Sequence, residues 1–148
     1  MLSIEPLESL RSAPIADPFV LLVDDHAPSL RQLRDVVTMF GHACVSAGSA
    51  SDALVYCDAR SPQVVVTDLS MPDLDGQGLA RWLKARYPTL PIILVTGEEL
   101  DASTIAELRQ TFEEVLKKPV DISTLLAVLD RLMVASADRD RDDAPSCP

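Results

Sequence analysis

The chain alternates short β-branched or apolar runs with segments of helical periodicity, and this pattern restricts the possible folds more than any other feature. Five runs are predicted to be strands, at residues 19–23, 43–46, 64–67, 92–95 and 115–116. A helical segment follows each of them. Strand–helix–strand units assemble by right-handed crossovers into a parallel sheet that is covered by helices on both faces. The sequence therefore predicts a doubly wound α/β domain with five parallel strands and five flanking helices.

Apolar residues at helical spacing mark the five helices. The positions that define them are Leu30, Leu33, Val36, Val37 and Phe40; Ala50, Ala53, Leu54 and Cys57; Leu79, Trp82 and Leu83; Ile105 and Leu108; and Leu125, Leu126, Leu129, Leu132 and Met133. Pro28 suits the first turn of the first helix and Gly41 its C-cap, and Asp121 or Ser123 can cap the last helix. Each apolar face is expected to pack on the sheet.

Composition divides the chain into three parts. Residues 18–135 carry the strand and helix pattern, and residues 136–148 are a charged segment expected to be a flexible tail. Residues 1–17 form a polar, proline-containing extension in which Ile4, Leu7 and Leu10 recur every three residues. Two interpretations of this extension stay open: partial disorder, or a short amphipathic helix that docks on the domain or on a partner.

Charge and composition argue against several classes of protein. The formal net charge is −10 and the basic residues are scattered, so direct binding to nucleic acid or to anionic membranes is not expected. The apolar runs are far shorter than the ~20 residues of a membrane-spanning helix. Three cysteines without a Cys-x-x-Cys pair indicate neither a disulfide framework nor a zinc site. Glu5 and Glu8 stand where a secretory signal would be basic, so a cytoplasmic location is expected.

Chemically active side chains follow four of the five predicted strands. Asp24 and Asp25 come after the first strand, Asp68 after the third, Thr96 after the fourth and Lys118 after the fifth. Doubly wound sheets bind their ligands beyond the carboxyl ends of the strands. These side chains are therefore expected to converge at one edge of the sheet.

The predicted cluster favours phosphoryl chemistry. Three neighbouring carboxylates repel one another and attract a cation, and hard oxygen ligands favour Mg²⁺, which commonly shares its coordination shell with a phosphate. Lys118 and the Thr96 hydroxyl can contact phosphate oxygens. Asp68 is the candidate nucleophile because it stands alone at its strand end, before a loop that leaves it exposed, whereas Asp24 and Asp25 can hold the metal.

An ordered set of motifs across the five strands resembles the receiver domain of two-component response regulators, over residues 19–134. The motifs are Asp24–Asp25, Asp68, Met71–Pro72, Asp75–Gly76, Thr96–Gly97 and Lys118–Pro119. The resemblance implies a flavodoxin-like sheet of strand order 2-1-3-4-5. It also implies that Asp68 accepts a phosphoryl group from a phosphohistidine, on a sensor histidine kinase or a histidine phosphotransfer protein.

The resemblance further implies how the metal is bound. Asp25 and Asp68 match direct Mg²⁺ ligands, the backbone carbonyl of Ser70 matches a third ligand, and Asp24 matches an acid that acts mainly through water. Ser70 and Glu98 also match variable positions that tune dephosphorylation.

Thr96 matches the switch hydroxyl of the family and Lys118 its phosphate-contacting lysine, and the Lys118–Pro119 peptide bond is expected to be cis.

Two positions depart from the family pattern. Val115 stands where an aromatic residue usually moves inward on activation, and Thr111–Phe112 replaces a Gly–Ala pair. These departures imply a different path for the preceding loop and place the usual output face in doubt.

The expected function is a phosphorylation switch that alters binding to an unknown downstream protein, rather than a turnover enzyme. Two alternatives stay open. A magnesium-dependent aspartyl-phosphate phosphatase would need an acid where Ser70 stands. A receiver-like scaffold that phosphate does not switch is favoured by Val115 but opposed by the intact acidic set.

The residues after the last helix are too few for an output domain. The chain is thus expected to act alone or within a longer protein such as a hybrid kinase, as a monomer or a weak homodimer.

Overall fold

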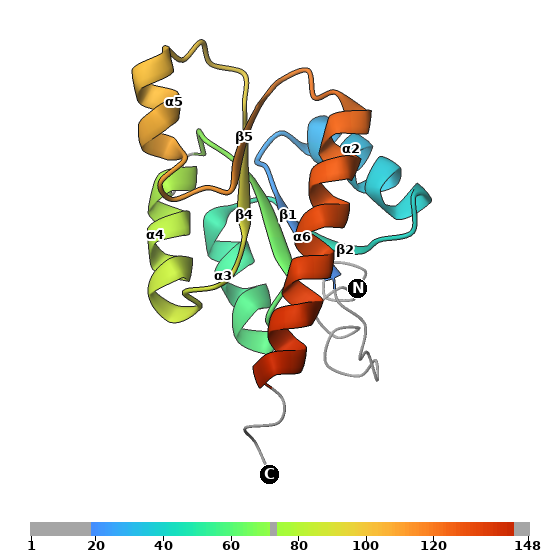
Figure 1. Ribbon diagram of the computed structural model, residues 1–148. Coiled ribbons are helices and arrows are strands. Elements are labelled where there is room, and N and C mark those ends of the chain that lie inside the picture. Colours follow the sequence, from blue (N-terminus) through green and yellow to red (C-terminus); the bar gives the residue numbers. More distant parts are fainter. Residues whose placement is uncertain (1–18, 72–73, 144–148) are drawn as a thin grey trace.

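Five parallel strands form a single sheet in the order β2-β1-β3-β4-β5 (Figure 1). The structure is a computed structural model that describes residues 19–71 and 74–143. The strands are β1 (Phe19–Val23), β2 (Ala43–Ala47), β3 (Val64–Asp68), β4 (Ile92–Thr96) and β5 (Glu114–Lys117). Their carboxyl ends all point to the upper edge in Figure 1. The predicted doubly wound fold and the strand order implied by the family resemblance are both confirmed.

Helices cover both faces of the sheet. One face carries α2 (Ala27–Met39) and α6 (Ile122–Asp143), and the other carries α3 (Ala50–Ala59), α4 (Gly76–Arg86) and the short α5 (Ala102–Leu108) (Figure 1). Two apolar clusters follow from this arrangement, because successive strand residues point to opposite faces. Leu21 and Leu94 pack towards α3 and α4, whereas Leu22 and Ile93 pack towards α2 and α6. All four side chains are fully buried.

Phe40, which periodicity placed on the apolar face of the first helix, is not part of the core. Leu30 and Val37 of the same predicted stripe are buried, but Phe40 is 59% exposed. The reason is that Phe40 is the C-cap residue, one position beyond the helix, where the chain turns away through Gly41 with a φ of +96°. A glycine adopts this left-handed conformation without the steric cost that a side chain would add.

The last helix is longer than the apolar pattern indicated. Asp121 accepts a hydrogen bond from the Thr124 amide at 3.1 Å, which caps the start of α6 as expected. The helix then continues to Asp143, into the segment predicted to be a flexible tail. The extension of residues 1–17 lies outside the described residues, and the division at residues 17 and 135 stays a prediction.

In the described part of the chain, no helix combines the length and the apolar character needed to cross a bilayer.

Cys57 of α3 should make the domain less stable at alkaline pH. Burial raises the pKa of its thiol from 9.0 to about 11, with the Asp58 charge adding to the shift and Arg86 opposing it. Between these two pH values the unfolded thiol ionises while the folded one does not, so stability falls as pH rises from 9 and levels off above 11. We expect a loss of up to about 3 kcal/mol, measured by urea unfolding across this range. Cys57→Ala should flatten the curve, and an unchanged slope would contradict the assignment to Cys57.

Candidate functional site

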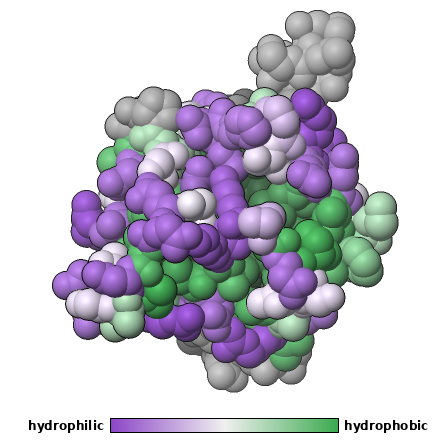
Figure 2. Space-filling view, turned by 90° about the horizontal axis from the view of Figure 1, so that it is seen from above, coloured by the Kyte–Doolittle hydropathy of each residue, from purple (hydrophilic) through white to green (hydrophobic). Residues whose placement is uncertain are grey.

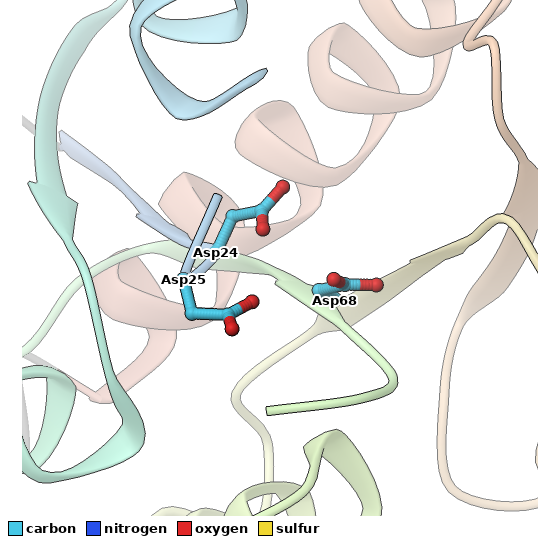
Figure 3. A group of neighbouring side chains, drawn as sticks. All are labelled: Asp24, Asp25 and Asp68. Carbon is cyan, nitrogen blue, oxygen red and sulfur yellow. The ribbon is translucent and has the colours of Figure 1, made fainter. Parts of the chain in front are cut away.

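The chemically active residues at the strand ends meet at one edge of the sheet, as predicted. Asp24 and Asp25 directly follow β1, Asp68 ends β3, Thr96 ends β4, and Lys118 directly follows β5. Figure 2 looks down on this edge, where hydrophilic and apolar surfaces adjoin around a hollow. Oxygens of the three carboxylates lie within 4.8 Å of one another, and Figure 3 shows the three side chains together. Such a set of hard oxygen donors is compatible with a divalent metal ion.

The loop after β1 places the two aspartates differently. The Asp24 amide donates to the Ala47 carbonyl at 3.1 Å, extending the pairing with β2 by one residue, and Asp24 is only 5% exposed. Its carboxylate accepts a hydrogen bond from the His26 amide at 2.9 Å. Asp25, the next residue, is exposed. One acid is thus held by the backbone while its neighbour faces the solvent side of the site.

His26 has a structural role that the sequence analysis missed. Its ring is the N-cap of α2 and accepts a hydrogen bond from the Ser29 amide at 3.3 Å. Serine, threonine, aspartate and asparagine are the usual capping residues, so no common sequence signal marks a histidine in this position. The cap fixes the start of α2 beside Asp24.

Asp68 is positioned by a close packing of backbone around it. The Leu69 amide donates to its Oδ1 at 2.8 Å, and the Leu69 carbonyl accepts from the Gly76 amide at 2.7 Å. A Cβ atom on Gly76 would lie 2.3 Å from the Asp68 carbonyl oxygen. Asp75 is the N-cap of α4 and accepts from the Gly78 amide. The Asp75–Gly76 motif therefore starts α4 and lets it approach the backbone of Asp68.

Gly76→Ala is expected to destabilise the domain and to displace Asp68. The added methyl group meets backbone, which cannot move aside as a flexible side chain can, and overpacking of this kind costs about 1–3 kcal/mol. Urea unfolding measures the loss, and the amide shifts of Asp68 and Leu69 report the displacement. Gly48→Ala is the matched control, because nothing lies within 4 Å of its new methyl group. Equal effects of the two substitutions would contradict the role assigned to Gly76.

Lys118, which directly follows the edge strand β5, reaches the carboxylates at the strand ends. Its Nζ lies 3.1 Å from Asp24 Oδ2 and 3.5 Å from Asp68 Oδ2. Burial by itself lowers the pKa of Lys118, but the hydrogen bond and charge of Asp24, together with Asp68, outweigh burial and leave this pKa raised. Burial raises the pKa of Asp68, and the Asp24 charge adds to this, although Lys118 and the Leu69 amide oppose it. Lys118 thus pairs with two of the three acids, and the three carboxylates leave an excess of negative charge for a cation to neutralise.

The Lys118–Pro119 peptide bond is cis, as the family resemblance implied.

Thr96, the last residue of β4, and Ser70, in the loop after β3, are both connected to Glu98. Thr96 is 2% exposed, and its hydroxyl accepts a hydrogen bond from the Glu98 amide at 3.0 Å. The Ser70 hydroxyl donates to the Glu98 carboxylate at 2.5 Å. This contact links the loop after β3 to the loop after β4. The predicted metal contact through the Ser70 backbone carbonyl stays a prediction.

The two departures from the family pattern lie together in the core. Phe112 is 1% exposed and belongs to the cluster against which the half-buried Val115 packs. The Leu108 carbonyl at the end of α5 accepts hydrogen bonds from the amides of both Thr111 and Phe112, at 3.0 and 2.8 Å. The turn is therefore tight, and it drives Phe112 into the interior before β5 begins.

Comparisons with known proteins agree on one family. A model of the response regulator receiver domain matches residues 20–130. The DNA-binding transcriptional regulator NtrC of Proteus hauseri is 36% identical over 113 residues, which are 76% of this chain but 24% of that protein. The sensor histidine kinase RcsC of Salmonella typhimurium is 31% identical over 76% of this chain and 12% of the kinase. The chain thus spans a quarter or less of the length of these relatives.

A solved structure supports the same conclusion. The crystal structure of a response regulator receiver protein from Pseudomonas putida aligns with a TM-score of 0.72 and 29% sequence identity, covering 79% of this chain and 98% of that chain.

Proposed function

Since the chain belongs to the receiver domain family of response regulators, we propose that it is a phosphoacceptor switch in which Asp68 takes a phosphoryl group in the presence of Mg²⁺. The observation that carries this proposal is the arrangement of Asp24, Asp25 and Lys118 around Asp68. The phosphoryl group comes from a phosphohistidine on a sensor histidine kinase or a histidine phosphotransfer protein. Such donors work in the cytoplasm, which is where we place this domain.

Asp68 acts as the nucleophile. A carboxylate oxygen forms the new bond to phosphorus while the bond from phosphorus to the donor's imidazole nitrogen breaks, and the electron pair leaves with the nitrogen. The bond from the Leu69 amide to Oδ1 holds the carboxylate in place. Lys118 favours the charged, nucleophilic form of Asp68 and would contact an oxygen of the transferred group.

The acidic residues fit a magnesium ion. Asp25 and Asp68 would bind it directly with the Ser70 carbonyl, whereas Asp24, already engaged by Lys118 and the His26 amide, would act through water. When bound, Mg²⁺ neutralises the charge that builds up between the carboxylates and the phosphoryl oxygens. The excess negative charge of the site makes this neutralisation necessary.

The response to phosphorylation would pass through Thr96. Its hydroxyl accepts from the Glu98 amide and can donate its own proton to a phosphoryl oxygen. Movement of this hydroxyl would pull on the loop after β4, whose Glu98 accepts a hydrogen bond from Ser70, and so bias the region of β4 and α5 towards a second conformation. Val115 has no aromatic ring that could move inward on activation, so this part of the family's usual response is absent. The altered loop would change binding to a downstream protein, with the chain a monomer or a weak homodimer.

Neither alternative function gains support from the site. A phosphatase needs an acid at the position of Ser70, whose hydroxyl donates to Glu98 instead. An unswitched scaffold would have no need for three clustered acids, two of which pair with a lysine.

Intact-mass analysis tests the proposal. After incubation with acetyl phosphate and Mg²⁺, we expect one added phosphoryl group per chain, and no adduct when EDTA removes the metal, because the acids then repel the incoming phosphate. Beryllium fluoride with Mg²⁺ should bind as a stable mimic even if the adduct hydrolyses quickly. Failure of both reagents would contradict a phosphoacceptor, and release of phosphate with many turnovers from phosphomonoesters would favour the phosphatase.

A further inference from the structure

The two oxygens of the Asp24 carboxylate have separate partners. Oδ1 accepts a hydrogen bond from the His26 amide at 2.9 Å, and Oδ2 accepts one from Lys118 Nζ at 3.1 Å. Asp24 is only 5% exposed, so water competes little for either oxygen. A carboxylate held at both oxygens cannot turn freely about its side-chain bonds. The orientation of Asp24 therefore depends on where the chain places the N–H group of residue 26.

The ring of His26 fixes the backbone of the same residue. His26 is the N-cap of α2, and its Nδ1 accepts a hydrogen bond from the Ser29 amide at 3.3 Å and lies 2.7 Å from the Ser29 hydroxyl oxygen. Its backbone carbonyl accepts from the Leu30 amide at 3.0 Å. In a capping box, a side chain of the first turn accepts from the N–H of the N-cap residue. In this chain Asp24 supplies that acceptor, so the helix cap and the acidic site share one residue.

The cap of α2 depends on a single pair of residues. An N-cap side chain bonds the amide of the second or the third helical residue. The second residue of α2 is Pro28, which has no N–H group, so of these two positions only Ser29 offers an amide. The first turn also contains no acidic residue that would stabilise the positive end of the helix dipole. The start of α2, and with it the N–H of residue 26, therefore depends on the His26 ring.

A histidine cap also leaves the charge of the site unchanged. Aspartate is among the most common N-cap residues. At position 26 it would add a fourth carboxylate beside Asp24, Asp25 and Asp68, whose oxygens already lie within 4.8 Å of one another. An imidazole with one accepting nitrogen is neutral. His26 therefore caps the helix without adding to the repulsion between the acids.

The orientation of Asp24 matters more for Mg²⁺ than for Ca²⁺. With both oxygens engaged, Asp24 would contact the waters of a bound ion, and Asp25 and Asp68 would contact the ion itself. Mg²⁺ requires nearly ideal octahedral geometry and keeps several waters, whereas Ca²⁺ accepts about six to eight oxygens in a flexible arrangement. A displaced Asp24 would thus disturb the shell of Mg²⁺ more than that of Ca²⁺.

We propose that His26 is a positioning residue for the metal site. Its ring caps α2 and so holds its own N–H on Asp24, and the fixed carboxylate favours Mg²⁺ over Ca²⁺. The selectivity between ions rests on the proposed function of the site, whereas the hold of the ring on Asp24 does not.

Hydrogen exchange of the metal-free chain, followed by NMR, tests the hold on Asp24. In His26→Ala, the protection of the residue 26 amide against exchange should fall about fivefold, the usual effect of a lost N-cap. His26→Asn should restore this protection, because asparagine is a good cap. Ser49→Ala is the matched control: Ser49 caps α3 by accepting from the Asp52 amide at 3.1 Å, and its loss should leave residue 26 unchanged.

Titrations of the same variants with MgCl₂ and with CaCl₂ test the selectivity. The amide shifts of Asp25 and Leu69 report binding of each ion. His26→Ala should raise the Kd for Mg²⁺ about fivefold or more, since groups that orient metal ligands contribute at least this much to affinity, and should raise the Kd for Ca²⁺ less. His26→Asn should restore the wild-type ratio. Ser49→Ala should leave both constants unchanged although it also removes a helix cap.

Three outcomes would overturn the proposal. Unchanged protection of the residue 26 amide in His26→Ala would mean that the ring does not hold it on Asp24. An equal rise of both Kd values would mean that the cap does not act through the geometry of the metal shell. An effect of Ser49→Ala as large as that of His26→Ala would identify a general loss of stability as the cause. A wild-type chain that binds neither ion would contradict the proposed function, and the metal-free exchange would still decide whether His26 positions Asp24.

Discussion

Asp68→Asn is expected to abolish phosphoryl transfer to the chain. An amide is a far weaker nucleophile than a carboxylate, and removal of an enzymatic nucleophile costs roughly four orders of magnitude or more in rate. The substitution keeps the shape of the side chain and the oxygen that accepts from the Leu69 amide. It also removes one of three crowded negative charges, so the fold should be retained. Intact mass after acetyl phosphate and Mg²⁺ should show no adduct.

Two further substitutions make this experiment specific. Asp25→Asn should slow labelling without ending it, because the metal loses one ligand while the acceptor remains. Asp58→Asn is the matched control: Asp58 is exposed on α3 and pairs with Arg86 at 3.2 Å, and its loss should leave labelling unchanged. Labelling of the Asp68→Asn variant at the wild-type rate would show that the acceptor is another residue.

Phe112→Ala is expected to cost about 3–5 kcal/mol of unfolding free energy. Phe112 is 1% exposed and is the largest of the fully buried side chains in the described residues. Its removal leaves a cavity between α5 and the sheet, because the surrounding strands cannot collapse to fill it. Urea unfolding with a two-state fit measures the loss.

The control for Phe112 is Val55→Ala, since Val55 is 49% exposed and should change stability by no more than about 0.5 kcal/mol. The result also bears on the family departure at this position. Alanine is the usual residue there, so a large loss would show that this core has adapted to Phe112. A loss below about 1 kcal/mol would mean that the tight turn after α5, rather than the buried ring, explains the departure.

The positions of the strands and helices could be predicted from the sequence because they depend on local patterns. β-Branched runs such as residues 64–67 favour extended backbone, and three- or four-residue spacing such as that of Leu125 and Leu129 marks a helical face. Parallel topology then places every strand's carboxyl end at one edge. For this reason the grouping of Asp24, Asp25, Asp68 and Lys118 was predictable without coordinates.

Other features depend on residues far apart in the chain and emerged only from the tertiary structure. Lys118 and Asp24 are 94 positions apart, and no local pattern gives the 3.1 Å between them or the way in which Lys118 divides its contacts between two acids. The close approach of Gly76 to Asp68 depends on how α4 packs. Periodicity placed Phe40 on the apolar face of α2, but whether a residue on that face is buried depends on where the sheet ends beneath it. Spacing along the sequence specifies direction around a helix, whereas burial is decided by the neighbours that the fold brings to it.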